Sequence, residues 1–372
     1  MNLNNISGVT FTELLEYGYK NLVAHYKAIN DLNVFPVPDG DTGTNMKMTI
    51  EGGIGEISTL DDNNIYEVTK KLSRGMLMGA RGNSGVILSQ LFRGFYKGCT
   101  DLLSLNAISL SKAFDSGVKQ AYKAVMTPTE GTILTVARMA SEKMLLIANS
   151  KMTIREFFYE YLEEAKHALQ MTPELLPVLK EAGVVDSGGA GYVCIIEGML
   201  KALDGEILDV KTADINSIAR VAQFTINPDT KNDEYGYCTE FLLQLSSEKV
   251  GDIEAFDEKV ILDKIAPLGN SIVLLKDEGI VKTHIHTLQP GVILNIAQEY
   301  GEFVKLKIEN MSIQHSELTE IKHVEEGSCA CGEVHKLPTT KPEIRSKYSV
   351  VAVASVSDLI GSVSNLCEIC ME

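Results

Sequence analysis

The segment Asn33–Met46, NVFPVPDGDTGTNM, carries two acidic residues whose spacing indicates chemistry. Asp39 and Asp41 are two residues apart, with Gly40 between them and Gly43 following. Glycine permits the tight backbone that brings two neighbouring carboxylates to one small site. Such carboxylates repel each other unless a cation lies between them, and their oxygens suit Mg²⁺. Taken alone, however, the segment is explained better by an Asp-Gly turn with solvated carboxylates.

Three more glycine-rich segments each precede an apolar run. They are Gly79–Gly85 (GARGNSG), Thr129–Thr132 (TEGT) and Asp186–Gly191 (DSGGAG). Backbone amides at the start of a helix can hold phosphate, because the helix dipole places partial positive charge there. Each segment alone is equally an ordinary capped helix start. Four such segments in one helical region, one of them with paired carboxylates, favour a polyphosphate site.

A second group of residues indicates a different metal. In the segment Val281–Thr287, VKTHIHT, a strand places His284 and His286 on the same face. Cys238, in the separate strand-like run YGYCTEF, can add a thiolate, and one cysteine with two histidines suits Zn²⁺. Two structural histidines and a buried cysteine remain the alternative. Further candidate ligands or supporting groups are Glu240 and His315.

The remaining cysteines have no regular metal spacing. Cys329 and Cys331 lie near His335, and Cys367 is three residues before Cys370. A second zinc site or a redox pair is one interpretation, and free exposed thiols are the simpler one. Seven cysteines in a chain of this length favour free thiols and metal ligands over a disulfide framework.

Helical periodicity dominates the first two hundred residues, which must position the glycine-rich segments. A Thr10-x-x-Glu13 capping pattern opens a helix over 10–32. Further helices are predicted near 64–78, 84–98, 107–126, 132–149, 153–170, 173–182 and 188–203. Beyond Gly205, strands are predicted at Ile218–Ile226, Tyr237–Leu245, Ser271–Lys276 and Gly279–His286, with helices around 252–264 and 290–301. The sequence therefore predicts an all-α region followed by an α/β or α+β region.

Composition and charge exclude several classes of function. The 372 residues are 45% hydrophobic and carry a formal charge of −16, without a basic stripe. Non-specific binding to nucleic acid or to an anionic membrane is therefore not expected. We find neither an apolar run long enough for a transmembrane segment nor a secretory signal, so a cytoplasmic location is the expectation.

The order of the motifs resembles a known family. PDGDTGTNM, followed by GARGNSG, EGT and VDSGGAG, is similar to the nucleotide-binding domain of the dihydroxyacetone kinase type. The longer forms NVFPVPDGDTGTNM and GARGNSGVILSQ resemble more specifically the fatty acid kinase catalytic subunit, over about residues 1–345. This resemblance implies an antiparallel helical barrel that holds ATP at one end through two Mg²⁺ ions, followed by a mixed α/β middle domain.

The resemblance also implies roles for individual residues. Asp39 and Asp41 match the metal-binding acids at the centre of catalysis, and Asn33 stands nearest to a third acid of the dihydroxyacetone kinases. The positions matching contacts to nucleotide, phosphate or metal are Thr42, Gly43, Thr44, Asn45, Gly82, Asn83, Ser84, Thr132 and Asp186. In the middle domain, GYCTEF and VKTHIHT resemble a zinc site formed by Cys238, His284 and His286.

The implied activity is ATP-dependent phosphorylation of a fatty acid presented by a fatty-acid-binding partner protein. The product is an acyl phosphate for phospholipid synthesis, and a homodimer is expected. A carboxylate acceptor is already ionised at neutral pH, so no strong general base is needed. The alternatives are a dihydroxyacetone-type (glycerone) kinase and a non-catalytic nucleotide-binding regulatory remnant.

Four segments follow from the resemblance and the composition. A helical kinase domain is expected over 1–205 and a zinc-binding middle domain over 206–322. A polar linker over 323–347 and the start of a third domain over 348–372 complete the chain. The run YSVVAVAS resembles the first strand of that third domain, most of which is expected to be missing. Docking of the acyl-carrying partner is therefore less certain than binding of ATP.

Overall fold

The computed structural model describes residues 3–60, 62–206 and 236–311. The predicted strand Ile218–Ile226, His315, and the linker and C-terminal segment with two cysteines each lie outside these ranges. The chain divides into two compact units, Met1–Val324 and Glu325–Glu372, and all described residues belong to the first. None of the described helices combines the length and the apolar character needed to cross a membrane.

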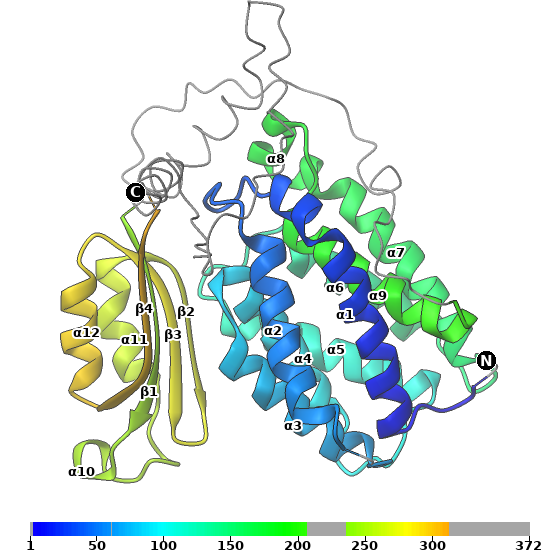
Figure 1. Cartoon of the computed structure of the whole chain (residues 1–372), viewed down its shortest axis with the longest axis horizontal. Helices are drawn as coiled ribbons and strands as arrows, with labels where there is room; N and C mark the ends of the chain where they lie inside the picture. Colours follow the sequence, from blue (N-terminus) through cyan, green and yellow to red (C-terminus); the bar gives the residue numbers. More distant parts are fainter. Residues whose placement is uncertain (1–2, 61, 207–235, 312–372) are drawn as a thin grey trace, which may run out of the picture. The chain divides into compact units, whose positions relative to one another are not determined.

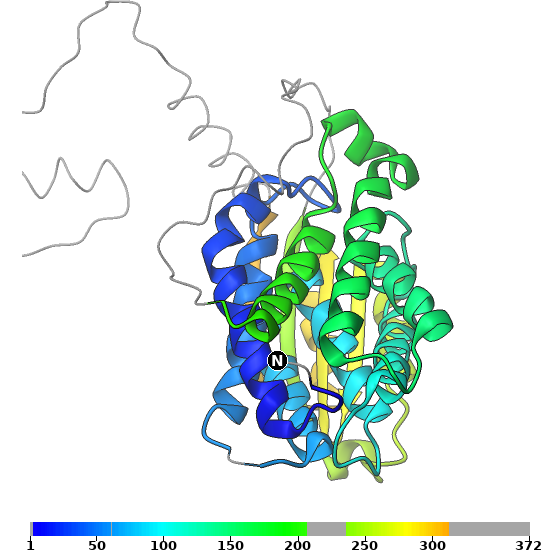
Figure 2. The ribbon, with the colours of Figure 1, turned by 90° about the vertical axis from the view of Figure 1, so that its right-hand side faces the viewer.

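The N-terminal part is a closed ring of helices (Figures 1 and 2). Each long helix packs against the next along the chain, and the last, α9, packs against α1. The helices are α1 (Gly8–Asp31), α2 (Thr42–Ile57), α3 (Ile65–Gly79), α4 (Gly82–Gly98), α5 (Ala107–Ala124), α6 (Ile133–Ile147), α7 (Ile154–Leu175), α8 (Pro177–Ala182) and α9 (Ser187–Asp204). Short connections make sequential neighbours antiparallel. The predicted antiparallel helical barrel is confirmed.

Two predicted boundaries of the ring are wrong. The first helix begins at Gly8, because the side chain of Ser7 accepts a hydrogen bond from the amide of Thr10, so Thr10 is helical and is not the cap. The predicted break before Pro173 is also absent, since α7 continues to Leu175. The polypeptide leaves the helix only at Leu176.

Helix α2 is not among the predicted helices, because its glycines suggest a loop. Those glycines instead allow α2 and α3 to approach each other closely. A Cβ atom on Gly53 would lie 2.7 Å from Leu72 and 2.5 Å from Met76, and one on Gly79 would lie 3.2 Å from the Cα of Gly52. Close packing between the helices therefore offsets the low helix propensity of glycine.

The second part is a four-stranded antiparallel sheet with helices on one face (Figure 1). The strand order is β2-β3-β1-β4, formed by β1 (Tyr237–Leu245), β2 (Asn270–Asp277), β3 (Ile280–Thr287) and β4 (Gly301–Asn310). The helices are α10 (Ser247–Val250), α11 (Lys259–Ile265) and α12 (Pro290–Gln298). An apolar core lies between the sheet and α11 and α12. This domain is therefore mixed in α and β content, and its sheet is antiparallel throughout.

The predictions for this domain need three corrections. The helix expected around 252–264 begins only at Lys259, and the one expected to end at 301 ends at Gln298. Strand β4 was not predicted. It contains a bulge: Leu243 is opposite Phe303, whereas Leu242 is opposite Lys305, so one residue of β4 has no partner on β1.

The other face of the sheet packs against the helical ring. Val273 and Leu275 of β2 join an apolar cluster with Leu77, Ala80 and Val86. Nearby, the guanidinium of Arg93 donates to the carbonyl of Lys276 at 2.9 Å and to the Asp277 carboxylate at 2.7 Å. These contacts fix which edge of the ring faces the sheet, and so they position the site described next.

Candidate functional site

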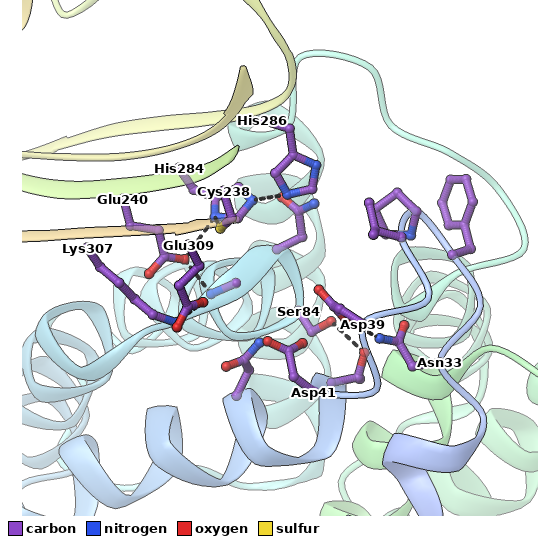
Figure 3. A pocket seen from close by; sticks show the side chains of 17 residues that line it. Asn33, Asp39, Asp41, Ser84, Cys238, Glu240, His284, His286, Lys307 and Glu309 are labelled. Carbon is purple, nitrogen blue, oxygen red and sulfur yellow. Dashed lines mark hydrogen bonds and ion pairs between the residues drawn. The ribbon is translucent and has the colours of Figure 1, made fainter. Parts of the chain in front are cut away.

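One pocket is lined by residues of both parts of the chain (Figure 3). From the helical ring come Asn33, Phe35, Pro36, Val37, Asp39, Asp41, Thr42, Asn45, Gly82, Asn83 and Ser84. From the sheet come Cys238, Glu240, His284, His286, Lys307 and Glu309. The two groups of candidate residues in the sequence, the paired aspartates and the cysteine with two histidines, therefore share one pocket.

The hydroxyl of Thr42 lies where three helices begin. Thr42 is the first residue of α2, and its Oγ1 atom accepts hydrogen bonds from Ser84 of α4 at 3.4 Å and from Ser187 of α9 at 3.2 Å. Three of the four glycine-rich segments therefore converge, and Asp41 occupies the N-cap position of α2 without a side-chain capping hydrogen bond. Of these three helices, α2 and α4 contribute residues to the pocket lining, and their first turns provide amides and partial positive charge for an anion.

Asp39 lies in an environment that disfavours its charge. Burial raises the pKa of Asp39 to about 8, and the neighbouring Asp41 carboxylate adds to the shift. The amide of Asn33 donates to Asp39 Oδ1 at 2.5 Å, which partly offsets both effects. A divalent cation between the two carboxylates would remove their repulsion, so this pair fits Mg²⁺. Asn33, the residue nearest to the position of a third acid in the resembling family, thus contacts Asp39 through its side-chain amide.

The start of α4 requires glycine at its first position. Gly82 has a φ of +57°, and a Cβ atom there would collide with the side-chain amide of Asn45. The amides of Gly82, Asn83 and Ser84 belong to the first turn, where no intrahelical acceptor exists. The Gly82 amide donates instead to Oε1 of Glu240 at 2.5 Å. The carboxylate of Glu240 therefore lies at the start of this helix, a position that favours anions.

Four predicted site residues do not line this pocket. The amide of Thr44, next to Gly43, donates to the Asn30 side chain at 3.1 Å, and the Thr44 hydroxyl accepts from the same side chain. Thr132 and Asp186 are N-caps of α6 and α9. Asp186 accepts from the Gly189 amide at 2.7 Å, and burial raises its pKa to about 6. These residues shape the helix starts around the pocket.

The side chains of Cys238, His284 and His286 form a compact cluster. One ligand atom from each lies within 4.8 Å of the other two, and the Nε2 atoms of the two histidines are 3.2 Å apart. The Nδ1 atom of His284 lies 2.8 Å from Glu240 Oε1 and 3.8 Å from the Cys238 sulfur, and the Nε2 atom of the same ring faces His286 (Figure 3). Burial and, to a smaller extent, the adjacent His284 together lower the pKa of His286 to about 3, so His286 is neutral and able to bind a metal.

The register of the sheet arranges these side chains in two rows. Glu240 is opposite both His284 and Lys307, and Cys238 is opposite both His286 and Glu309. Side chains opposite each other on neighbouring strands share one face. All six side chains therefore face the same pocket.

Sequence reasoning missed the residues that β4 and the segment before Asp39 contribute. Phe35, Pro36 and Val37 form an apolar wall, and Lys307 and Glu309 add charge. The alternation of Lys305, Leu306, Lys307, Ile308 and Glu309 is a strand signal that was available in the sequence.

Comparison with known families agrees with this arrangement. Residues 36–201 match the DAK2 domain, and residues 234–318 match the middle domain of FakA-like (fatty acid kinase) proteins. The chain therefore contains a DAK2 domain followed by a FakA-like middle domain. The family resemblance seen in the motifs is confirmed.

Curated relatives of this DAK2-domain protein are longer. It is 42% identical to Protein YloV of Bacillus subtilis over 371 residues, which cover 98% of this chain and 64% of YloV. It is 45% identical to an uncharacterized protein of Staphylococcus aureus strain USA300 over 319 residues, 85% of this chain and 58% of that protein. The chain thus spans about three fifths of the length of these relatives.

Among solved structures, this DAK2-domain protein is similar to the dihydroxyacetone kinase from C. freundii, crystallised with AMP-PNP and Mg²⁺. The TM-score is 0.39 and the identity 17%, over 51% of this chain and 33% of that chain. This likeness lies below the level that establishes a shared fold.

Proposed function

We propose that this chain binds Mg-ATP in the pocket beside Asp39 and Asp41 and transfers the terminal phosphoryl group to a fatty acid carboxylate. The observation that carries the proposal is the convergence of three helix starts at Thr42, next to paired carboxylates. The match to the DAK2 domain supports kinase chemistry, and the middle-domain match supports a fatty acid as acceptor.

The residues of the pocket suit phosphoryl transfer, which depends on alignment and on neutralising charge. Asp39 and Asp41 would hold two Mg²⁺ ions, which neutralise the phosphates when bound. The amides of Asn83 and Ser84, in the first turn of α4, orient the phosphate oxygens. A carboxylate oxygen forms a bond to the terminal phosphorus, the bond to the β–γ bridging oxygen breaks, and ADP leaves with the electron pair. No proton is transferred, because the acceptor is ionised.

The lining of the pocket supports a carrier for the acceptor. Apart from the wall of Phe35, Pro36 and Val37, the pocket is lined mainly by polar and charged side chains. An alkyl chain needs extended apolar surface, because each buried CH₂ contributes roughly 0.8 kcal/mol. We therefore propose that a fatty-acid-binding partner protein holds the alkyl chain and presents the carboxylate to this pocket.

We propose zinc as the metal bound by Cys238, His284 and His286. In a tetrahedral zinc site, two nitrogen ligands lie about 3.3 Å apart, and the observed separation of the two Nε2 atoms is 3.2 Å. Two unprotonated ring nitrogens at this distance would repel each other without a cation. Metal analysis of the purified protein should give about one zinc per chain. His284→Ala should lose it, whereas exposed His167→Ala should keep it.

The decisive experiment measures ATP turnover with and without a partner protein loaded with fatty acid. We expect formation of acyl phosphate and ADP only when the loaded partner is present. Binding of Mg-ATP without turnover under any condition would instead support a regulatory nucleotide-binding protein. Phosphorylation of dihydroxyacetone in place of the fatty acid would reject the proposed acceptor and keep the nucleotide site.

A further inference from the structure

Lys307 supplies positive charge to a pocket whose other charged lining residues are acidic. Among the described residues that line the pocket, it is the one lysine, and the same lining contains no arginine. Four carboxylates line the pocket, those of Asp39, Asp41, Glu240 and Glu309. The terminal phosphoryl group spreads negative charge over three oxygens during transfer, so a cation beside it stabilises the transition state.

The register of β4 places Lys307 beside the phosphate-binding helix start. Lys307 is opposite Glu240, whose carboxylate accepts the hydrogen bond from Gly82, the first residue of α4. Opposite residues on neighbouring strands have Cβ atoms about 5 Å apart. Figure 3 shows the Lys307 side chain on the pocket side of its strand, next to Glu240 and Glu309. The flexible side chain of lysine can reach an anion bound at the same helix start.

The ion pair between Lys307 and Glu309 does not by itself account for this position. The two charged atoms are 2.6 Å apart, and the side chains are 26% and 33% exposed. A pair this exposed contributes only about 0–1 kcal/mol to stability. Burial acts to lower the pKa of Lys307, but the hydrogen bond to Glu309 and the nearby carboxylates outweigh it and raise the pKa. Glu309 therefore keeps a charged ammonium at the mouth of the pocket.

We propose that Lys307 contacts the terminal phosphate of bound ATP, so that the middle domain supplies a cation to the nucleotide site of the helical ring. This inference rests on the proposed binding of Mg-ATP. In the absence of nucleotide the ammonium pairs with Glu309, and on binding it exchanges this carboxylate for a phosphate oxygen. ADP lacks that phosphate, so Lys307 distinguishes the substrate nucleotide from the product nucleotide.

The test compares two nucleotides on the full chain by calorimetry. Lys307→Met should weaken binding of Mg-AMP-PNP by about tenfold and leave the affinity for Mg-ADP within about twofold, since one charge-assisted hydrogen bond is lost. Lys305→Met is the matched control, because Lys305 lies two residues away on the same strand face and does not line the pocket. It should change neither affinity. Lys307→Arg should retain most of the preference for AMP-PNP.

A change at Glu309 should act in the opposite direction. Glu309→Gln removes the carboxylate that competes for the ammonium, so we expect tighter binding of Mg-AMP-PNP and an unchanged affinity for Mg-ADP. If Lys307→Met lost the same affinity for both nucleotides, or kept the wild-type preference for AMP-PNP, the role of Lys307 would be overturned. The proposed binding of Mg-ATP would not be affected by that result. A wild-type protein that binds neither nucleotide would overturn the proposed function together with this inference.

Discussion

The carboxylate of Glu240 accepts a hydrogen bond from the backbone amide of Gly82 over 2.5 Å, across 158 residues of sequence. The same oxygen atom, Oε1, lies 2.8 Å from Nδ1 of His284. Burial acts to raise the pKa of Glu240, but the hydrogen bond with His284 and the charges of His284 and Lys282 outweigh burial and lower it to about 2. One ionised oxygen therefore supports both the start of α4 and the orientation of a proposed zinc ligand.

Replacing Glu240 by glutamine should weaken the proposed zinc site. Glutamine keeps an acceptor oxygen but loses the charge that makes His284 a stronger ligand, so zinc affinity should fall by about 10- to 100-fold. Competition with a chelator measures this change. Glu302→Gln, an exposed change on β4, is the control and should behave as the wild type. Equal zinc retention in all three proteins would contradict a supporting role for Glu240.

Replacing Asp39 by asparagine should separate binding from stability. The variant loses a metal ligand, so calorimetry should detect no binding of Mg-ATP. Above about pH 8, where Asp39 is ionised, its thermal unfolding temperature without metal should equal or exceed that of the wild type, because a buried repulsive charge is removed while the oxygen that accepts from Asn33 is retained. Asp115→Asn, which breaks an exposed pair with Lys119, should bind normally. Wild-type affinity in Asp39→Asn would refute the site.

Binding of Mg²⁺ should depend on pH through Asp39. Its pKa in the metal-free fold is raised from 3.8 to about 8, so between these values the folded state holds more protons than the unfolded chain. Stability of the metal-free protein should therefore decrease as pH rises through this window. Mg²⁺ must displace the proton, so its apparent affinity should be highest above about pH 8 and fall as pH is lowered.

Calorimetry with Mg²⁺ alone, in two buffers of different ionisation enthalpy, would measure this proton release. Omitting the nucleotide removes any contribution from titration of its phosphates. Near neutral pH we expect release of close to one proton for each occupied Asp39–Asp41 site. An affinity that does not change with pH would show that the pair binds Mg²⁺ without displacing a proton.

Two glycine-to-alanine changes should have opposite effects. Gly82→Ala forces a side chain onto a residue with a φ of +57° and against Asn45, so it should lower the free energy of unfolding by more than about 1 kcal/mol and weaken nucleotide binding. Gly55→Ala lies in α2, where a Cβ atom meets nothing within 4 Å. It should raise stability by roughly 0.5–1 kcal/mol and leave binding unchanged. Denaturant unfolding checks both, and an unperturbed Gly82→Ala would contradict the strain argument.

The sequence predicts the helical ring well because its helices carry long apolar periodicities and capping residues. It also predicts that His284 and His286 share a face, since this follows from the pleat alone. Helix α2 is not predicted because Gly52 and Gly53 have low helix propensity. In the structure these glycines allow close contact with α3, which comes later in the chain.

The joint pocket could not be predicted from either motif. Its existence depends on how the sheet packs against the ring, and this is fixed by distant contacts such as the pair of Arg93 with Asp277. Such contacts leave no periodic signal, because one arginine and one aspartate are common surface residues. The role of Glu240 as a link between the start of α4 and His284 has the same origin. Sequence spacing identifies the two sets of ligands and gives no information on their separation.

The bulge in β4 determines which side chains of this strand face the pocket, because side chains alternate between the two faces of a sheet. Phe303 is opposite Leu243, and the unpaired residue after it brings Lys305 opposite Leu242, so Lys307 and Glu309 face the pocket. With regular pairing from Phe303 onward, Leu306 would be opposite Glu240 and would face the pocket in place of the ammonium. An insertion or deletion of one residue in β4 between Phe303 and Lys307 would therefore replace the charged side chains of the pocket lining by apolar ones. An insertion or deletion of two residues would keep the charged side chains in the lining.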